Sequence, residues 1–204
     1  MNKAVIHIDL QHPFLDAHTL SAFQGAKRMS EMARATNLTN IWIACALRNT
    51  PATTFKEAKR SRLFYDLEME VVEPQEDELF FGKTQANAFL NMHLCAHIQE
   101  HEYDELFITG VWANACVKSS IIGAFSQAAA WKPFPRISIV QDAVDIMSNP
   151  DYDDTMSSIR SMRRHKSPEH YLKMFNHSHP IKSRPRKNLG LISTEEFANH
   201  YGLN

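Results

Sequence analysis

A carboxylate, an amine and a thiol follow three short apolar segments of this chain. Asp9 follows AVIHI (4–8), Lys83 follows ELFFG, and Cys116 lies five residues after LFITGV (106–111). A nearby ammonium group favours the thiolate form of a cysteine, which is its nucleophilic form. A carboxylate can accept the thiol proton and later return it to a leaving amine. These residue types predict a nucleophile site if the fold brings them together.

Cys116 also stands where the next helix is expected to begin. The residues before it, ITGVWANA (108–115), pass from an apolar run into a short polar stretch. Unpaired N–H groups and the helix dipole favour negative charge at a helix N-terminus, and N–H groups in the preceding turn can hold a developing oxyanion. We therefore expect the pKa of Cys116 to lie below the value of about 8.5 that a free thiol has.

Each of these residues has a simpler interpretation when it is taken alone. Asp9 can cap the loop that follows it, Lys83 can be a surface lysine, and Cys116 can be an inert core thiol. Their coincidence at expected strand ends favours the site. The other cysteines, Cys45 in IWIACAL and Cys95 in MHLCAHI, are expected inside a strand and a helix as packed thiols. Three cysteines without a small-domain framework indicate free thiols in a reducing compartment.

Short apolar segments alternate with longer amphipathic ones along the chain. Four segments are apolar almost without interruption, as in strands covered on both faces, and we expect strands at 4–8, 40–47, 106–111 and 137–140. Helical periodicity predicts helices near 19–37, 54–67, 85–101 and 115–131. We expect ELFF (78–81) to form a short edge strand, LGLIS (189–193) a last strand, and Thr194 the cap of a terminal helix.

This alternation predicts an α/β fold of three layers, in which helices cover both faces of a mostly parallel, doubly wound sheet with right-handed crossovers. Ligands bind such sheets beyond the carboxyl ends of the strands. Asp9, Lys83 and the turn before Cys116 would then face one crevice. The length of 204 residues fits a single domain, 1–204, with a sizeable core.

The composition narrows the range of partners. The chain is 44% hydrophobic and 22% charged with a net charge of -1, which gives no global field that favours nucleic acid or an anionic membrane. No stretch approaches the roughly 18 apolar residues of a membrane span, and Asp9 and His12 interrupt the first apolar run too early for a signal peptide. We expect a cytoplasmic protein that acts on a small molecule, with no nucleic-acid or membrane partner.

Three motifs carry a resemblance to a known family. AVIHIDLQHPF, FFGKTQANAF and LFITGVWANACVKSSIIGAF follow one another in this order, IVQDAVD (139–145) comes next, and TEEF lies near the end of the chain. Over about residues 1–147, and in this ending, the sequence resembles the isochorismatase-like cysteine hydrolases. These include nicotinamidase, ureidoacrylate amidohydrolase and N-carbamoylsarcosine amidase.

The resemblance implies a catalytic triad of Asp9, Lys83 and Cys116. It also implies a cis peptide between Val111 and Trp112, and an oxyanion hole formed by the N–H groups of Trp112 and Cys116. The implied reaction is hydrolysis of a carbon–nitrogen bond in a small amide, ureide or carbamoyl compound through a thioester on Cys116. Asp9 would act as acid and base, and Lys83 would orient it and stabilise the thiolate. A homo-oligomer, either a dimer or a tetramer, is implied as well.

The chain departs from some members of this family. Nicotinamidases usually carry Asp-x-His after the second strand, where it helps to bind a metal, whereas this chain has RNTPATTF there. We therefore expect no metal, no other cofactor, and an activity different from that of nicotinamidase. Isochorismatases that cleave a vinyl ether lack the cysteine, so Cys116 favours acyl chemistry. Trp112, together with Phe14, Phe55 and Phe81, predicts a narrow apolar substrate pocket.

Some histidines allow more than one interpretation. His93, His97 and His101 recur every fourth residue and would share one helix face, as a half-exposed surface or as part of a two-histidine metal site; the surface is favoured. His7 would share a strand face with Asp9, either as a packed core histidine, which is favoured, or as a group that tunes the carboxylate.

The segment 155–187 departs from the alternating pattern. It contains many Lys, Arg and His residues and one acid, Glu169. We expect a solvated helix and loop inserted near the end of the domain, and the alternatives are a lid, a subunit contact or an anion-binding patch. Basic residues alone are a weak signal for nucleic-acid binding.

Two functions other than hydrolysis are open to this sequence. A thiol-reactive protein of the same fold would use Cys116 without turning over an amide, and a non-catalytic binding module would bind through the basic segment. A Cys-x-x-Cys exchange mechanism is excluded, because no second cysteine stands near Cys116 in the sequence. Loss of amide turnover in Asp9→Asn would separate hydrolysis from thiol reactivity.

Overall fold

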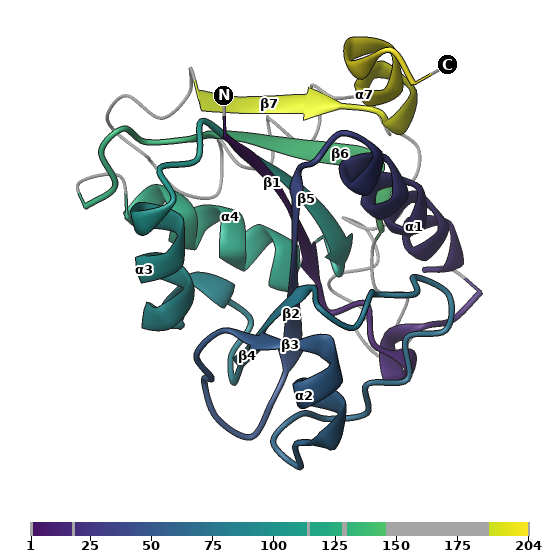
Figure 1. Ribbon diagram of the computed structural model, residues 1–204, viewed down its shortest axis with the longest axis vertical. Helices are drawn as coiled ribbons and strands as arrows, with labels where there is room; N and C mark the ends of the chain where they lie inside the picture. The colour runs from purple at the N-terminus through teal and green to yellow at the C-terminus, as the bar shows by residue number, and fades with distance from the viewer. Residues whose placement is uncertain (1, 18, 114, 128–129, 146–187, 204) are drawn as a thin grey trace, which may run out of the picture.

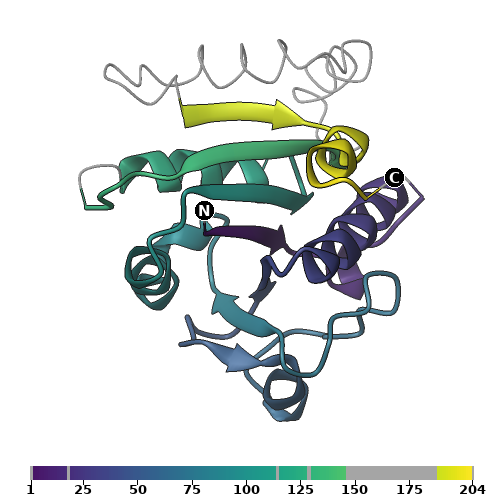
Figure 2. The ribbon, with the colours of Figure 1, turned by 45° about the horizontal axis from the view of Figure 1, so that its top comes forward.

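A seven-stranded sheet forms the centre of the protein in the residues that the computed structural model describes, which are 2–17, 19–113, 115–127, 130–145 and 188–203. The strand order is β3-β4-β2-β1-β5-β6-β7, and only β3 and β4 pair antiparallel. Figure 2 shows the strands side by side from β7, in yellow, to β4 and β3, in blue. The strands are β1 (Lys3–Ile8), β2 (Thr39–Cys45), β3 (Thr53–Thr54), β4 (Leu79–Lys83), β5 (Glu105–Val111), β6 (Arg136–Asp145) and β7 (Leu189–Ile192).

Helices cover both faces of this sheet. One face packs against α3 (Met92–Glu100) and α4 (Cys116–Ser126), and the other packs against α1 (Leu20–Ala35), α2 (Phe55–Arg60) and α7 (Thr194–Tyr201). Short 3-10 helices, η1 (His12–Phe14) and η2 (Ala88–Leu90), lie in the described connections. Figure 1 shows α3 and α4 on one side of the sheet and α1 and α7 on the other. The predicted three-layer α/β/α fold is confirmed.

Alternate residues of β1 face the two layers of helices. Ala4, Ile6 and Ile8 lie in the apolar core with α3 and α4, whereas Val5 lies in the core with α1 and α7. All of residues 4–8 are buried, because both faces of the strand are covered. This explains why the segment is apolar almost without interruption.

The chain reverses its winding direction between β1 and β5. It runs outward from β1 to β2 and β4, and then returns past β1 to β5, which pairs with the opposite side of β1. In open parallel sheets, ligand sites lie beyond the carboxyl ends of the strands at such a switch point. The ends of β1, β4 and β5 carry Asp9, Lys83 and the turn before Cys116 to this edge.

The predicted helix at 54–67 is wrong beyond its first half. The helix α2 ends at Arg60, and Ser61 has an extended backbone with φ -82° and ψ 136°. The following residues join the end of β2 instead, where the N–H group of Leu47 donates to the carbonyl oxygen of Leu63 at 2.7 Å. This tertiary pairing outweighs the local helical periodicity.

Other element boundaries differ from the predictions as well. The ELFF segment is not an edge strand, because β4 lies between β2 and β3. The cap of α7 is Ser193 rather than Thr194, since Ser193 forms a capping box with Glu196. The helix predicted at 85–101 begins only with α3, after η2, and β6 continues well beyond 137–140.

The basic segment 155–187 lies outside the described residues, so its structure and role remain predictions. Among the residues that are described, no helix is long and apolar enough to cross a membrane.

Candidate active site

Asp9 follows β1 directly and has a left-handed backbone conformation, with a φ of 54°. Aspartate adopts this conformation more readily than bulky residues do. Its N–H group donates to the carbonyl oxygen of Ile43 in β2 at 2.9 Å, and the residue is only 1% exposed. The end of β1 thus buries a carboxylate, which is unfavourable unless the charge has a partner.

Lys83 supplies that partner from the end of β4. Its Nζ lies 2.7 Å from Oδ2 of Asp9, and both side chains are 2% exposed. Burial alone would lower the pKa of Lys83, but the negative charge of Asp9 opposes this effect and the pKa is raised. The lysine therefore stays an ammonium ion beside Asp9 at neutral pH.

Cys116 is the first residue of α4 and lies next to this ion pair. Its Sγ is 3.6 Å from Nζ of Lys83. In the turn before it, the N–H group of Ala115 donates to the carbonyl oxygen of Trp112 at 2.9 Å, and the peptide bond between Val111 and Trp112 is cis. The structure thus brings together the carboxylate, the amine and the thiol that the sequence singled out.

The pKa of Cys116 is raised rather than lowered. Burial raises it most, the carboxylate of Asp9 raises it further, and Lys83 lowers it by less, so that the pKa is about 12. The expectation of a pKa below that of a free thiol is therefore wrong, because burial and the carboxylate of Asp9 outweigh the ammonium group of Lys83. The thiol carries its proton at neutral pH, and its activation requires a base in contact with it.

Cys45 is a second thiol at this site, which the sequence did not lead us to single out. It is the last residue of β2 and pairs in register with Lys83 of β4. Its Sγ lies 3.4 Å from Oδ1 of Asp9 and 3.8 Å from Nζ of Lys83. The expected strand at 40–47 placed Cys45 inside it, whereas β2 ends at this residue. The sequence carries no signal that the strand ends at Cys45 rather than at residue 47.

Gln11 holds the ends of β1 and β2 together. Its side chain is buried; Oε1 accepts from the N–H group of Cys45 at 2.6 Å, and Nε2 donates to the carbonyl oxygen of Tyr65. One amide group therefore holds together three segments that surround Asp9, Lys83 and the two thiols.

The four residues predicted to line the substrate pocket lie in different places. Phe14 and Trp112 contact each other edge to face, with ring centroids 5.2 Å apart, in the loops that follow β1 and β5. Phe81 is only 1% exposed and packs in the core with α3 and α4. Phe55 packs on the opposite face, where it lines a separate cavity.

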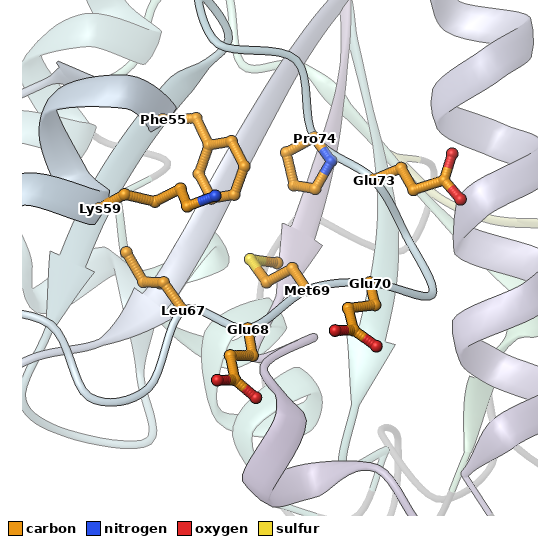
Figure 3. A pocket seen from close by; sticks show the side chains of 8 residues that line it. All are labelled: Phe55, Lys59, Leu67, Glu68, Met69, Glu70, Glu73 and Pro74. Atoms are coloured by element: carbon orange, nitrogen blue, oxygen red, sulfur yellow. The ribbon is translucent and has the colours of Figure 1, made fainter.

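That cavity has a volume of about 540 Å³ and is lined by Phe55, Lys59, Leu67, Glu68, Met69, Glu70, Glu73 and Pro74. Figure 3 shows Leu67 and Met69 across from the ring of Phe55, with Lys59 reaching over that ring. None of Asp9, Lys83 and Cys116 lines it.

His7 is a packed core histidine, as favoured from the sequence. Its Nδ1 lies 2.7 Å from Oγ1 of Thr109, its Nε2 lies 3.0 Å from Oδ1 of Asn40, and its ring stacks on Trp42 at 4.0 Å. Burial lowers the pKa of His7 to about 4. The imidazole is therefore neutral over most of the pH range in which the protein is expected to work.

Among the described residues, no histidine of α3 belongs to a group of three or more His, Cys, Asp or Glu side chains whose ligand atoms lie close enough to share a metal ion. The rings of His97 and His101 lie tilted against each other with centroids 4.0 Å apart, and burial lowers the pKa of His97 to about 4. In the part of the chain that the structure describes, the group whose ligand atoms lie close enough to share a metal ion is His12, Asp66 and Glu68, all of them exposed.

Comparisons with known proteins agree with this fold. The family model of the isochorismatase domain matches residues 3–166. The chain is similar to a solved cysteine hydrolase from Pseudomonas syringae pv. phaseolicola 1448A, with a TM-score of 0.67 and 16% identity over 99% of this chain and 93% of that one. For N-carbamoylsarcosine amidase from Thermoplasma acidophilum the TM-score is 0.59, with 16% identity over 96% and 98% of the two chains. An isochorismatase-like hydrolase from Alkaliphilus metalliredigens has a TM-score of 0.62 and 15% identity over 98% and 99%.

At these identities the structural likeness shows the fold alone. A comparison with curated protein sequences gave no match. The family model, by contrast, matches well over half of the sequence, so the chain belongs to the isochorismatase family.

Proposed function

We propose that the protein is a cysteine hydrolase that cleaves a carbon–nitrogen bond of a small amide, ureide or carbamoyl compound. The observation that carries this proposal is the position of the Lys83 ammonium group, 2.7 Å from Oδ2 of Asp9 and 3.6 Å from Sγ of Cys116. A nucleophile, a base and a cation that holds both together are the groups that acyl transfer by a thiol requires.

The first half of the reaction makes a thioester. Asp9 takes the proton of the Cys116 thiol as the sulfur attacks the substrate carbonyl, and the carbonyl oxygen becomes an oxyanion. The backbone N–H groups of Trp112 and Cys116 are the proposed donors to this oxyanion. That of Cys116 suits the role, because the first N–H groups of a helix have no acceptor within it. The intermediate then collapses, Asp9 gives its proton to the leaving amine, and the thioester remains.

The second half of the reaction returns the free enzyme. Asp9 takes a proton from a water molecule, which attacks the thioester carbonyl. Collapse of this second oxyanion breaks the carbon–sulfur bond, and the proton on Asp9 returns to the sulfur of Cys116. Lys83 keeps its charge throughout and stabilises each negative charge beside it. These residues supply every proton transfer, so the proposal includes neither a metal nor another cofactor.

The ion pair beside the thiol favours hydrolysis over thiol reactivity as the function. A scavenging or redox protein needs only a reactive thiol, whereas hydrolysis also needs a carboxylate that moves protons and a cation beside it, and Asp9 and Lys83 supply these groups. A thiol in contact with a carboxylate is suited to losing its proton only when a substrate carbonyl is in place. The likeness in fold to an N-carbamoylsarcosine amidase agrees with a small carbamoyl or amide substrate.

Further proposals concern the side chains that line the substrate pocket, the location of the protein in the cell and its oligomeric state. We propose Phe14 and Trp112 as an apolar wall, because their rings lie together beside the turn that precedes Cys116. We also propose that the protein is cytoplasmic. We propose that it forms a dimer or tetramer, since Leu90 and Met92 are large apolar side chains that are 50% and 82% exposed. Size-exclusion chromatography with light scattering would measure the number of subunits in the oligomer.

Ammonia release from a panel of small amides, ureides and carbamoyl compounds tests the hydrolase proposal. The wild type should turn over at least one of them, and Asp9→Asn and Cys116→Ala should each lose roughly 100-fold or more. Cys95→Ala is the matched control, because this thiol bonds to the carbonyl oxygen of Phe89 away from the site. Mass spectrometry of the quenched reaction should find the acyl group on Cys116.

Two results would contradict this proposal. An acyl group on Cys45 would make the other thiol the nucleophile. A wild type that releases no ammonia from any compound, while Cys116 reacts with alkylating agents, would favour the thiol-reactive protein.

A further inference from the structure

The backbone of Cys45 is held from three directions. Its N–H group donates to Oε1 of Gln11 at 2.6 Å, its carbonyl oxygen accepts from the N–H group of Tyr65 at 3.0 Å, and the next N–H group, of Ala46, donates to the carbonyl oxygen of Lys83 at 2.9 Å. Only the side-chain torsion of Cys45 remains to be set. The backbone thus places this side chain at the end of β2, between the strands that carry Asp9 and Lys83, and its contacts with those two residues define the torsion.

The thiol of Cys45 acts as a hydrogen-bond donor at this place. Burial raises its pKa to about 11, and the charge of Asp9 contributes to the rise. The sulfur therefore keeps its proton at neutral pH. An ionised carboxylate only accepts hydrogen bonds, so the contact of 3.4 Å between Sγ and Oδ1 of Asp9 is an S–H group donating to the carboxylate.

The two oxygens of Asp9 consequently have different partners. Oδ2 faces the Lys83 ammonium group at 2.7 Å, and Oδ1 faces the Cys45 thiol. Two fixed partners on the two oxygens determine the plane of a carboxylate, whereas one partner leaves it free to rotate. A base must keep its geometry through the reaction if proton transfer is to stay fast.

We propose that Cys45 is a positioning residue, whose thiol holds the carboxylate of Asp9 in the plane from which it exchanges protons with Cys116. This rests on the proposed hydrolase function and adds to it a residue outside the triad. The role does not require Cys45 to touch the substrate. It requires a side-chain donor at this position, which serine retains on a shorter bond and alanine lacks.

The test compares Cys45→Ala with Cys45→Ser, with Cys95→Ser as the control for loss of a half-buried thiol. In Cys45→Ala, kcat should fall about tenfold with little change in KM, as expected for one hydrogen bond to a charged group. Cys45→Ser should recover most of the lost kcat, because a hydroxyl group can still donate to the carboxylate of Asp9.

A second measurement does not depend on turnover. The rate of Cys116 alkylation by iodoacetamide, followed against pH by mass spectrometry, reports the fraction of Cys116 that is thiolate. Its midpoint should move to higher pH in Cys45→Ala and stay in place in Cys45→Ser. Cys95, mapped in the same digests, is the internal reference.

The two readouts separate this proposal from the hydrolase function. If no compound is turned over but the alkylation midpoint shifts only in Cys45→Ala, the positioning role stands and the hydrolase function fails. If turnover is present and the alanine and serine variants behave alike in both readouts, Cys45 only fills space and the positioning role is overturned.

Discussion

Buried charge determines how the residues of the site behave. Asp9 and Lys83 are both almost fully buried and lie 2.7 Å apart, so each charge compensates for the desolvation of the other. Removing one partner of such a pair leaves an unpaired buried charge and lowers the free energy of unfolding, whereas removing both partners can change that free energy little. The ion pair therefore contributes to stability as well as to the proposed chemistry.

Lys83→Met is expected to lower the free energy of unfolding by about 4 kcal/mol, because the Asp9 carboxylate then stays buried without its partner. The double variant Asp9→Asn/Lys83→Met should be more stable than Lys83→Met alone, since it leaves no unpaired charge. Urea unfolding measures both changes. Lys56→Met removes an exposed ion pair with Glu76 and should leave the unfolding midpoint nearly unchanged. A Lys83→Met variant as stable as the wild type would contradict the buried pair.

The sequence predicts the positions of Asp9, Lys83 and Cys116 because each stands at or just after a strand end. The carboxyl ends of parallel strands lie at one edge of the sheet, so short-range patterns are enough to predict that these residues lie close together. Cys45 could not be found in this way. Its contact with Asp9 depends on where β2 ends and on its register with β4, and neither can be deduced from spacing. The raised pKa of Cys116 likewise depends on burial that only the packed structure defines.

At the scale of elements, α1 approaches the sheet very closely. A Cβ atom added at Gly25 would lie 2.8 Å from Cα of Ala143 in β6, and closer still to the carbonyl oxygen of Asp142. Both neighbours are backbone atoms of a strand, which cannot move aside as a flexible side chain can. The helix α1 also follows the loop that starts at Asp9, so its contact with β6 helps to hold that loop in place.

Gly25→Ala is expected to destabilise the protein by about 2 kcal/mol, although alanine is the better helix former by roughly 1 kcal/mol. The added methyl group must push α1 away from β6, and this overpacking outweighs the gain in helix propensity. Gln24→Ala, on the exposed side of the same helix, is the matched control and should change stability little. Thermal unfolding of the two variants measures the difference, and a stabilised Gly25→Ala would show that the helix has room to shift.

The elements that the sequence predicts well are those with a pattern of their own. The strand at 4–8 is apolar because both of its faces are covered, and the structure extends it by one residue only. The helix at 54–67 fails because its second half pairs with the end of β2 through Leu47 and Leu63. Local periodicity cannot show such a contact, since the two segments meet only after the sheet has formed.

At the scale of the whole molecule, His7 places a titratable group in the middle of the sheet. It lies in β1, the central strand, and its ring contacts Asn40 and Trp42 of β2 and Thr109 of β5. Charging this ring would place an ion in the interior of the protein, and burial accordingly lowers its pKa to about 4. Protonation of His7 therefore opposes the packing of β1 against β2 and β5.

Stability should fall as the pH is lowered through the window set by His7. The unfolded chain binds a proton at His7 with a pKa of about 6.5, whereas the folded protein binds it only near 4. Between these values the unfolded state holds more protons, so the free energy of unfolding decreases with falling pH, by at most about 3 kcal/mol, and levels off below the folded pKa.

Urea unfolding from pH 8 to pH 4 measures this slope, to which His97 and the carboxylates also contribute. His7→Gln should remove the His7 share of the slope, and His12→Gln, at an exposed position, should not. Suppose instead that wild type and His7→Gln lose stability in parallel across this window. His7 would then have to be solvated or charged in the folded protein, and its burial between β2 and β5 would not determine when it binds a proton.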